Sequence, residues 1–397
     1  MRKLIYTLSL LTAASLYCHA ENTDSLPSWF SLSPEWRVGA KASASFVLPT
    51  NSFLDGDNPE SKSINKNIAG SIRAGFSFNE SSREGILYKG LYQGIGIGGN
   101  TFFAKSLVGS PMTAYVYQGA PVFNISDRLS INYEWNFGAA FGWKHYNEET
   151  PDNNAAVSTS VTAMMGLGFK LKYALSRNFD LSFGVEATHY SNGNTSWPNA
   201  GVNTVGLSVG FDYILNPQPK NSGKYEQLEE EADKGRWMYD VMVYGAWRKS
   251  VVSVGDPAEA QLCPGKFGVV GMQFSPMRKL NRWVAVAPSL DLQWDESAGI
   301  APYWVEGTHD EYLKFERPPL GKQISLGISA HAELTMTIFS VNAGIGYEII
   351  NPVGYNRFYQ SLTLKTFLTR HVYLNVGYRL GDFKNPQNLM LGIGVRF

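Results

Sequence analysis

Two residue types that can transfer acyl groups lie two positions apart near the middle of the chain, at His189 and Ser191. An imidazole beside a hydroxyl can take the serine proton while the serine oxygen attacks an ester carbonyl. Asn192 and the backbone of Gly193–Asn194 follow directly, and each donor to the resulting oxyanion contributes about 3 kcal/mol. The spacing therefore indicates acyl transfer by a serine nucleophile with a histidine base.

The pair stands at the end of a segment with the two-residue period of a β-strand. Every second side chain of a strand points the same way, so His189 and Ser191 share one side of the segment with three apolar residues. These are Leu181, Phe183 and Val185. Polar groups are costly on an apolar surface unless they have partners. In a membrane barrel this side would face lipid, which favours a substrate that lies in the membrane.

The same period recurs along the chain in segments of about ten residues separated by Gly, Pro, Asn, Asp and Ser, as in outer-membrane strands. Asn203–Tyr213 and Leu389–Phe397 are examples. A soluble β-sandwich would also alternate, but 13% aromatic residues, 39 Gly and a final Phe397 favour a membrane barrel. We therefore predict an all-β, transmembrane antiparallel β-barrel.

The composition excludes several other classes. The 34 Lys and Arg balance 34 Asp and Glu without a basic block, so we expect no nucleic-acid partner. After the first twenty residues, no apolar stretch approaches the roughly 18–20 residues of a membrane helix. With 2 Cys, a disulfide framework and a Cys-based zinc site are excluded, and Cys263 is expected to be unpaired. We expect no metal and no cofactor, and we interpret His309–Glu311 as a solvated loop.

The N-terminus has the pattern of a secretory signal peptide. Met1–Lys3 is basic, Leu4–Leu16 is apolar, and the small Ala20 precedes polar residues. We predict that residues 1–20 are a signal peptide cleaved after Ala20, so that the protein is exported. Lipid anchoring at Cys18 is less favoured because the bulky Tyr17 precedes that residue.

An internal repeat divides the mature chain. Phe169–Asn192 aligns without a gap with Leu362–Asn385, and a Lys, an Arg and a Gly recur at matching places. Each half can be read as eight strands. We predict two tandem eight-stranded barrels, with one larger barrel of up to sixteen strands as the alternative.

The predicted domains follow from this repeat. Residues 21–215 form the barrel with the His-x-Ser site, 216–236 an acidic linker, and 237–397 a second barrel repeat. In that repeat, Asp382 and Lys384 occupy the places of the pair, so no dyad is expected there.

The residues around the pair also resemble a known family. His189, Ser191 and Asn192, followed by Pro198, Asn199 and Gly201, match without a gap the His-x-Ser-Asn and Pro-Asn-x-Gly motif of the outer-membrane lipid A 3-O-deacylases, which are acyloxyacyl hydrolase-like. Tyr92–Ile97 and Leu107–Pro111 are similar to the family's Gly-rich strand and Gly-x-Pro loop. The resemblance covers roughly Arg37–Leu215. It implies a bacterial outer-membrane serine esterase that removes an ester-linked acyl chain from lipid A of lipopolysaccharide, without a cofactor.

The resemblance also implies residue roles. Ser191 would be the nucleophile, His189 the general base, and Asn192 and Asn199 would shape the oxyanion site. Asn203 departs from the family, whose well-known members carry there a Glu that orients the His. An amide can orient a catalytic His but cannot stabilise an imidazolium by charge, so we expect reduced or differently tuned activity.

Two other functions stay open at this point. One is a non-catalytic outer-membrane barrel, either a channel or a structural protein, in which the pair is incidental. The other is a phospholipase that acts on glycerophospholipids with the same chemistry. The expected partner is lipid A or lipopolysaccharide around a membrane-embedded chain, and a homo-oligomer is an open alternative. A pair that faces lipid favours the esterase, whereas a pair that faces the lumen favours the channel.

Overall fold

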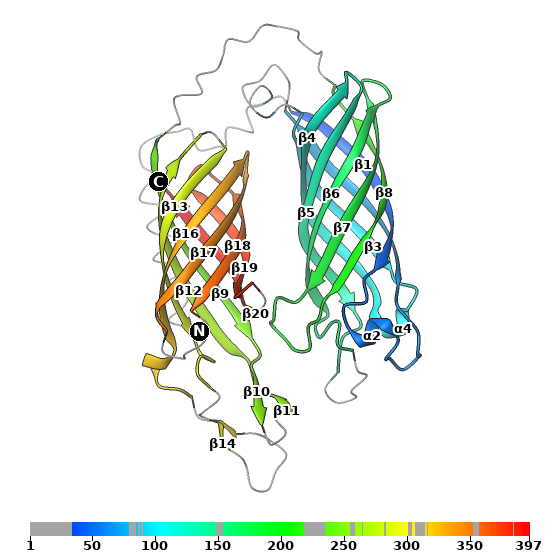
Figure 1. Ribbon diagram of the computed structural model, residues 1–397. Coiled ribbons are helices and arrows are strands. Elements are labelled where there is room, and N and C mark those ends of the chain that lie inside the picture. Colours follow the sequence, from blue (N-terminus) through cyan, green and yellow to red (C-terminus); the bar gives the residue numbers. More distant parts are fainter. Residues whose placement is uncertain are drawn as a thin grey trace. The chain divides into compact units, whose positions relative to one another are not determined.

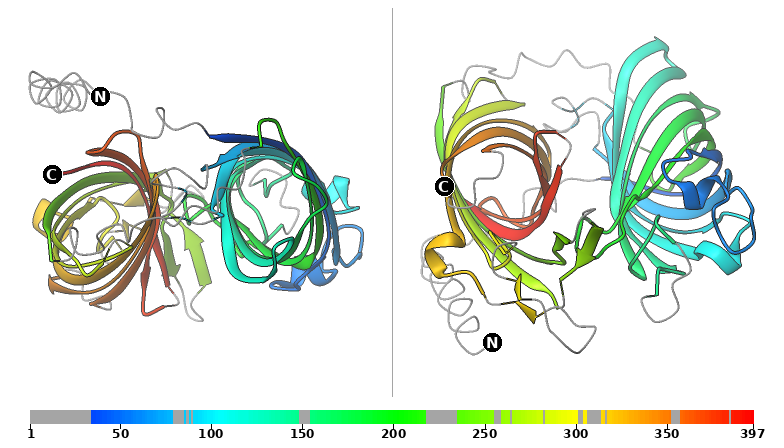
Figure 2. Two further views of the ribbon diagram at one scale, coloured as in Figure 1. Left: turned by 90° about the horizontal axis from the view of Figure 1, so that it is seen from above. Right: turned by 60° about the horizontal axis from the view of Figure 1, so that its bottom comes forward.

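The computed structural model describes residues 34–78, 85, 88, 90–147, 154–217, 235–254, 259–263, 265–281, 283–300, 304–305, 314–315, 317–351, 357–383 and 385–397. Within these residues, the strands form two closed antiparallel barrels of eight strands each, seen from the side in Figure 1 and from two further directions in Figure 2. The all-β prediction and the choice of two barrels are confirmed. The predicted signal peptide, and residues 218–234 of the predicted linker, lie outside the described residues.

In the first barrel each strand pairs with the next, and β8 pairs with β1 to close the wall. The strands are β1 (Glu35–Val47), β2 (Lys66–Ser77), β3 (Tyr92–Thr101), β4 (Gly109–Ser126), β5 (Leu129–Trp143), β6 (Val161–Ala174), β7 (Phe179–Ser191) and β8 (Val202–Ile214). Two short helices, α2 (Ser52–Asp55) and α4 (Lys105–Val108), lie in loops at the end of the barrel where β7 finishes.

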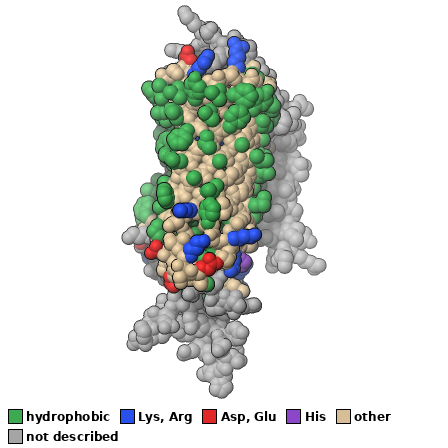
Figure 3. All heavy atoms as spheres, turned by 90° about the vertical axis from the view of Figure 1, so that its right-hand side faces the viewer, with side chains coloured by type: hydrophobic (Ala, Val, Ile, Leu, Met, Phe, Trp, Pro, Cys, Tyr) green, Lys and Arg blue, Asp and Glu red, His purple; other side chains and the backbone are tan. Residues whose placement is uncertain are grey.

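The wall of the first barrel follows the alternation of the sequence. In β7, Leu181, Phe183 and Val185 are exposed while Ser182 is buried. On the face seen in Figure 3, hydrophobic side chains are spread over the wall, whereas Lys, Arg, Asp and Glu lie toward the two ends of the barrel. An apolar outer band with a polar interior is the pattern of a barrel that spans a membrane.

Ion pairs fill the interior of the first barrel. Arg73 lies 3.0 Å from a Glu134 oxygen and 2.8 Å from an Asp212 oxygen, and Lys170 also pairs with Glu134. Buried charges persist only when they are paired and hydrogen-bonded. These contacts join β2, β5, β6 and β8 across the interior, which leaves the outer wall to the apolar residues.

The Gly-rich segment Tyr92–Ile97 lies within β3. Ile97 is exposed on the outer wall, whereas Gly96 faces inward. A Cβ at Gly96 would lie 2.4 Å from Cζ of Tyr115. Glycine is therefore required at this position because the tyrosine ring occupies the space of a side chain.

The second barrel is closed by pairing of β20 with β9. Its strands are β9 (Trp237–Arg248), β12 (Phe267–Lys279), β13 (Val284–Asp295), β16 (Ile324–Met336), β17 (Phe339–Ile350), β18 (Phe358–Phe367), β19 (Val372–Gly381) and β20 (Asn385–Arg396). Its loops carry two small hairpins and a 3-10 turn: β10 (Val251–Val254) with β11 (Glu259–Leu262), β14 (Trp304–Val305) with β15 (Lys314–Phe315), and η3 (Leu320–Lys322).

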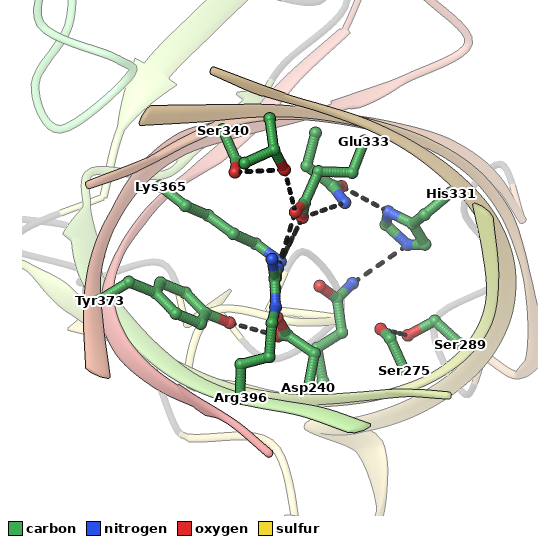
Figure 4. Close-up of polar contacts among 12 residues, drawn as sticks. Asp240, Ser275, Ser289, His331, Glu333, Ser340, Lys365, Tyr373 and Arg396 are labelled. Atoms are coloured by element: carbon green, nitrogen blue, oxygen red, sulfur yellow. Dashed lines mark hydrogen bonds and ion pairs between the residues drawn. The ribbon is translucent and has the colours of Figure 1, made fainter. Parts of the chain in front are cut away.

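Two cations and two carboxylates meet inside the second barrel (Figure 4). Lys365 lies 3.1 Å from Asp240 and 3.0 Å from Glu333. Arg396 lies 2.7 Å from an oxygen of each of these carboxylates, and Tyr373 donates a hydrogen bond to Asp240. This network ties the first strand of the barrel to its last strand and so helps to close the wall.

The repeat found in the sequence falls on matching strands. Phe169–Asn192 contains the end of β6, from Phe169 to Ala174, and all of β7, whereas Leu362–Asn385 contains the end of β18, from Leu362 to Phe367, and all of β19. These are the sixth and seventh strands of their barrels.

Cys263 is free among the described residues, as expected, and burial raises the pKa of its thiol. None of the helices in the described part of the chain is long and apolar enough to cross a membrane.

Candidate active site

Neighbouring strands bring the predicted residues to one place on the outer wall. His189 pairs directly with Asn203 of β8 and, on its other side, with Met165 of β6. Ser191 is the last residue of β7 and pairs with Ala163 of β6. Because Met165 is 41% exposed on the outer wall, its cross-strand neighbour His189 also lies on that wall.

A short hydrogen bond joins the candidate base to its neighbour on β8. Nδ1 of His189 lies 2.7 Å from Oδ1 of Asn203. A carbonyl oxygen can only accept, so Nδ1 donates this hydrogen bond and Nε2 is the nitrogen left to act as a base in the neutral ring. The amide thus holds the imidazole in the form that a general base requires.

Ser191 receives a hydrogen bond from the backbone. The N–H of Gly193 donates to Oγ of Ser191 over 3.2 Å. Among the described residues, no hydrogen bond joins Ser191 to His189. Such contacts are often long in enzymes without substrate and tighten when the substrate binds.

Gly201 lies close to both side chains. A Cβ at this position would be 3.1 Å from Cε1 of His189 and 3.6 Å from Cβ of Ser191. The residue has φ +73°, a conformation that glycine adopts without strain. His189 and Ser191 therefore flank one point, and a larger residue at Gly201 would enter the space between them.

Asn192 is arranged differently from the oxyanion donor that the sequence suggested. Its Nδ2 donates to Oγ of Ser158 over 2.9 Å and to the carbonyl of Ser196 over 3.1 Å. Both amide hydrogens are therefore used within the protein. Oδ1 of Asn192 is buried without a hydrogen-bond partner among the described residues.

Asn199 keeps its amide nitrogen available. Its Oδ1 accepts a hydrogen bond of 3.0 Å from the backbone N–H of Asn192. In the part of the chain that the structure describes, Nδ2 of Asn199 donates to no other residue. The backbone N–H of Gly193 thus contacts Ser191 directly, whereas Asn199 contacts the neighbouring residue Asn192.

No metal site is evident in the described ranges, where three or more His, Cys, Asp or Glu residues do not gather. The predicted solvated loop His309–Glu311 lies outside those ranges. All the contacts described at His189 and Ser191 are with uncharged groups: an amide, a backbone N–H and a glycine.

Models of known protein families match residues in both barrels. Residues 89–212 match the family described as lipid A 3-O-deacylase (PagL), and residues 237–397 match the family described as acyloxyacyl hydrolase, C-terminal domain. The first barrel is therefore similar to the lipid A 3-O-deacylases over residues 89–212, and the second to the acyloxyacyl hydrolase C-terminal domain over residues 237–397. The first match contains His189, Ser191 and Asn203, and the second extends the relationship to the half for which the sequence motifs gave no resemblance.

Comparison with solved structures found proteins of low sequence identity and low TM-score. Neisserial surface protein A is 12% identical over 45% of this chain and 96% of its own, with a TM-score of 0.30. The outer membrane enzyme PagL is 16% identical over 43% and 97%, with a TM-score of 0.29. The siderophore receptor PirA from Acinetobacter baumannii is 9% identical over 88% and 68%, with a TM-score of 0.25. A comparison with curated proteins found no match.

The second barrel contains a serine, a histidine and an asparagine that the sequence analysis did not connect. Nδ1 of His331 lies 2.7 Å from Oδ1 of Asn342, and its Nε2 lies 2.8 Å from Oγ of Ser329. All three side chains are buried, and His331 faces the interior (Figure 4). A Cβ at Gly344 would lie 2.2 Å from Cε1 of His331. The ring is packed against backbone, so this trio forms part of the polar core.

Proposed function

We propose that the first barrel is an outer-membrane serine esterase that removes an ester-linked acyl chain from lipid A of lipopolysaccharide. The observation that carries the proposal is the His189–Asn203 hydrogen bond of 2.7 Å beside Ser191 on the apolar outer wall. A wall of exposed Leu, Val and Phe side chains contacts lipid in a membrane barrel. Working residues on that wall meet a lipid substrate, whereas a channel needs them in the lumen.

The first half of the reaction transfers the acyl group to the enzyme. Oγ of Ser191 attacks the ester carbonyl while Nε2 of His189 takes the hydroxyl proton. The N–H of Gly193 and the amide of Asn199 donate to the oxyanion, which contributes about 3 kcal/mol for each donor. When the intermediate collapses, His189 returns the proton to the sugar oxygen, which leaves as an alcohol.

The second half of the reaction restores the enzyme. Water attacks the acyl-serine carbonyl while His189 takes one of its protons, and the intermediate collapses to a free fatty acid and Ser191. His189 returns that proton to Oγ. Asn203 holds the imidazole throughout, but as a neutral amide it does not offset the positive charge that forms on the ring in both halves.

A row of alanines that leads away from Ser191 supports a position for the acyl chain. Ser191 pairs with Ala163, Ala163 with Ala139 of β5, and Ala139 with Ala114 of β4. Larger side chains follow the row on both sides: Met112, Phe141 and Val161 on one, and Val116, Phe137 and Met165 on the other. Because alanine projects only a methyl group, an extended chain can lie along the row with its carbonyl at Ser191.

The row has a defined length. From Ser191 to Ala114 it crosses three strand spacings, about 14 Å. Beyond Ala114 the next paired residue is Ile97 of β3, which is 54% exposed. In this proposal Ile97 limits the length of the acyl chain that the row accommodates.

The experiment that tests the proposal is mass spectrometry of lipid A from cells that express the wild type, Ser191→Ala or His189→Ala. We expect loss of one acyl chain with the wild type and intact lipid A with both variants, each present in the outer membrane in equal amount. Glycerophospholipids from the same cells are measured in parallel. Unchanged lipid A together with Ser191-dependent lysophospholipid would replace the lipid A substrate by glycerophospholipid, and no change in either lipid would overturn the esterase.

A further inference from the structure

The loop that follows Ser191 is held by another loop, which the sequence motifs did not indicate. Residues 192–201 connect β7 to β8, and residues 154–158 precede β6. The N–H groups of Ala200 and Gly201 donate to the carbonyls of Ala155 and Ala156, each over 3.0 Å. These two bonds fix the end of the 192–201 loop where Gly201 lies against His189 and Ser191.

A buried asparagine shapes the supporting segment. Nδ2 of Asn154 donates to the carbonyl of Lys144 over 3.0 Å, and its Oδ1 accepts from the N–H groups of Ala156 and Val157. Asn154 and Ala156 are fully buried, and Val157 is 1% exposed. A side chain that bonds its own backbone two and three residues on closes a tight turn, so the segment presents its carbonyls in a fixed direction.

Asn192 connects most of the 192–201 loop. Its N–H donates to Asn199, its carbonyl accepts from the N–H and hydroxyl of Thr195, and its Nδ2 donates to Ser196. The remaining Nδ2 hydrogen bonds Oγ of Ser158 over 2.9 Å. The hydrogen bond to Ser158 thus joins Asn192, and with it the 192–201 loop, to the segment of residues 154–158.

We propose that Ser158 is a positioning residue for the reaction at Ser191, an inference that rests on the proposed function. Asn192 is covalently bonded to Ser191 and to Gly193, whose N–H points at Oγ of Ser191. When Ser158 holds Asn192, it sets the direction of that N–H relative to the serine oxygen. Ser158 is 8% exposed and contacts Asn192 rather than the reacting atoms, so it affects turnover through geometry rather than substrate binding.

The first arm of the test measures kcat and KM of the purified full-length protein on lipid A in detergent micelles. Displacing a catalytic group by about 1 Å can cost about 100-fold in rate, so Ser158→Ala should lower kcat by about 10- to 100-fold with KM unchanged. Ser158→Thr keeps the hydroxyl and should recover kcat. Ser160→Ala is the matched control, because Ser160 is exposed and its side chain makes no hydrogen bond within the described residues.

The second arm measures amide hydrogen exchange of the same proteins by mass spectrometry. Peptides that contain residues 192–201 should exchange faster in Ser158→Ala, and at the wild-type rate in Ser158→Thr and Ser160→Ala. Wild-type exchange or wild-type kcat in Ser158→Ala, or equal kcat in the Ala and Thr variants, would overturn the role of Ser158. Inactivity of the wild type on lipid A would overturn the proposed substrate instead, and the exchange arm would still decide whether Ser158 holds the loop.

Discussion

His189 Nδ1 and Asn203 Oδ1 lie 2.7 Å apart on paired positions of β7 and β8. The contact orients the imidazole as an acidic partner would, yet it brings no negative charge to the ring. A second His–Asn pair, His331 with Asn342, has the same distance of 2.7 Å inside the other barrel. The two pairs differ in the face of the barrel wall that they occupy. His189 lies on the outer wall, where lipid can reach it, whereas His331 is buried inside the second barrel.

Replacing the amide at Asn203 by a carboxylate should accelerate the reaction. The change of an acid to an amide in a serine triad can cost about ten-thousand-fold, so we expect Asn203→Glu to deacylate lipid A at least about 10-fold faster. Rates are compared by mass spectrometry of lipid A over time. Asn203→Gln adds the same side-chain length without charge and should not accelerate the reaction, and equal rates in the two variants would exclude charge as the limiting factor.

The two Ser–His–Asn groups should differ in function. Ser191→Ala should abolish release of fatty acid, whereas Ser329→Ala should leave it unchanged because Ser329 is buried inside the second barrel. Fatty acid released from purified lipid A is the measurement for both variants. A loss of activity in Ser329→Ala, with the barrel folded, would contradict the assignment of chemistry to the outer wall.

The alanine row predicts an effect of chain length. Ala163→Phe places a ring beside Ser191 and should lower activity on all acyl chains, whereas Ala114→Phe lies at the far end and should lower activity only on the longest ones. Activity is measured on a series of esters with increasing acyl length. Ala40→Phe is the matched control, since Ala40 lies exposed on β1 and outside the row. Equal length profiles for Ala114→Phe and the control would place the chain elsewhere.

The charged network of the second barrel should be sensitive to removal of one carboxylate. Asp240→Asn leaves Lys365 and Arg396 with Glu333 as their remaining carboxylate, and breaking a buried pair in this way costs about 3–5 kcal/mol. The free energy of unfolding from urea titrations of the protein in lipid vesicles measures the loss. Adding Lys365→Met should recover part of it because the charges then balance. Asp382→Asn, in the turn after β19, serves as a control that should not change stability.

The strands and their faces could be predicted from the sequence because they depend on a local rule. Side chains alternate along a strand, so the spacing of Leu181, Phe183 and Val185 was enough to place His189 and Ser191 on the outer wall. The site motif was recognised from its residue types and its resemblance to a known family, and the repeat from identities in an ungapped alignment. Asn203 was singled out by the resemblance, as the residue at the place of the family's Glu.

The sequence by itself determined which residues face lipid and which residue types could carry the chemistry. Only the tertiary structure decided which groups touch: that Asn192 contacts Ser158, that Gly201 lies close to both His189 and Ser191, and that the alanine row leads to the serine. The physical reason is that these contacts join segments whose register and loop paths are set by barrel closure and by backbone hydrogen bonds between loops. The alternation of side chains along a strand does not predict such contacts.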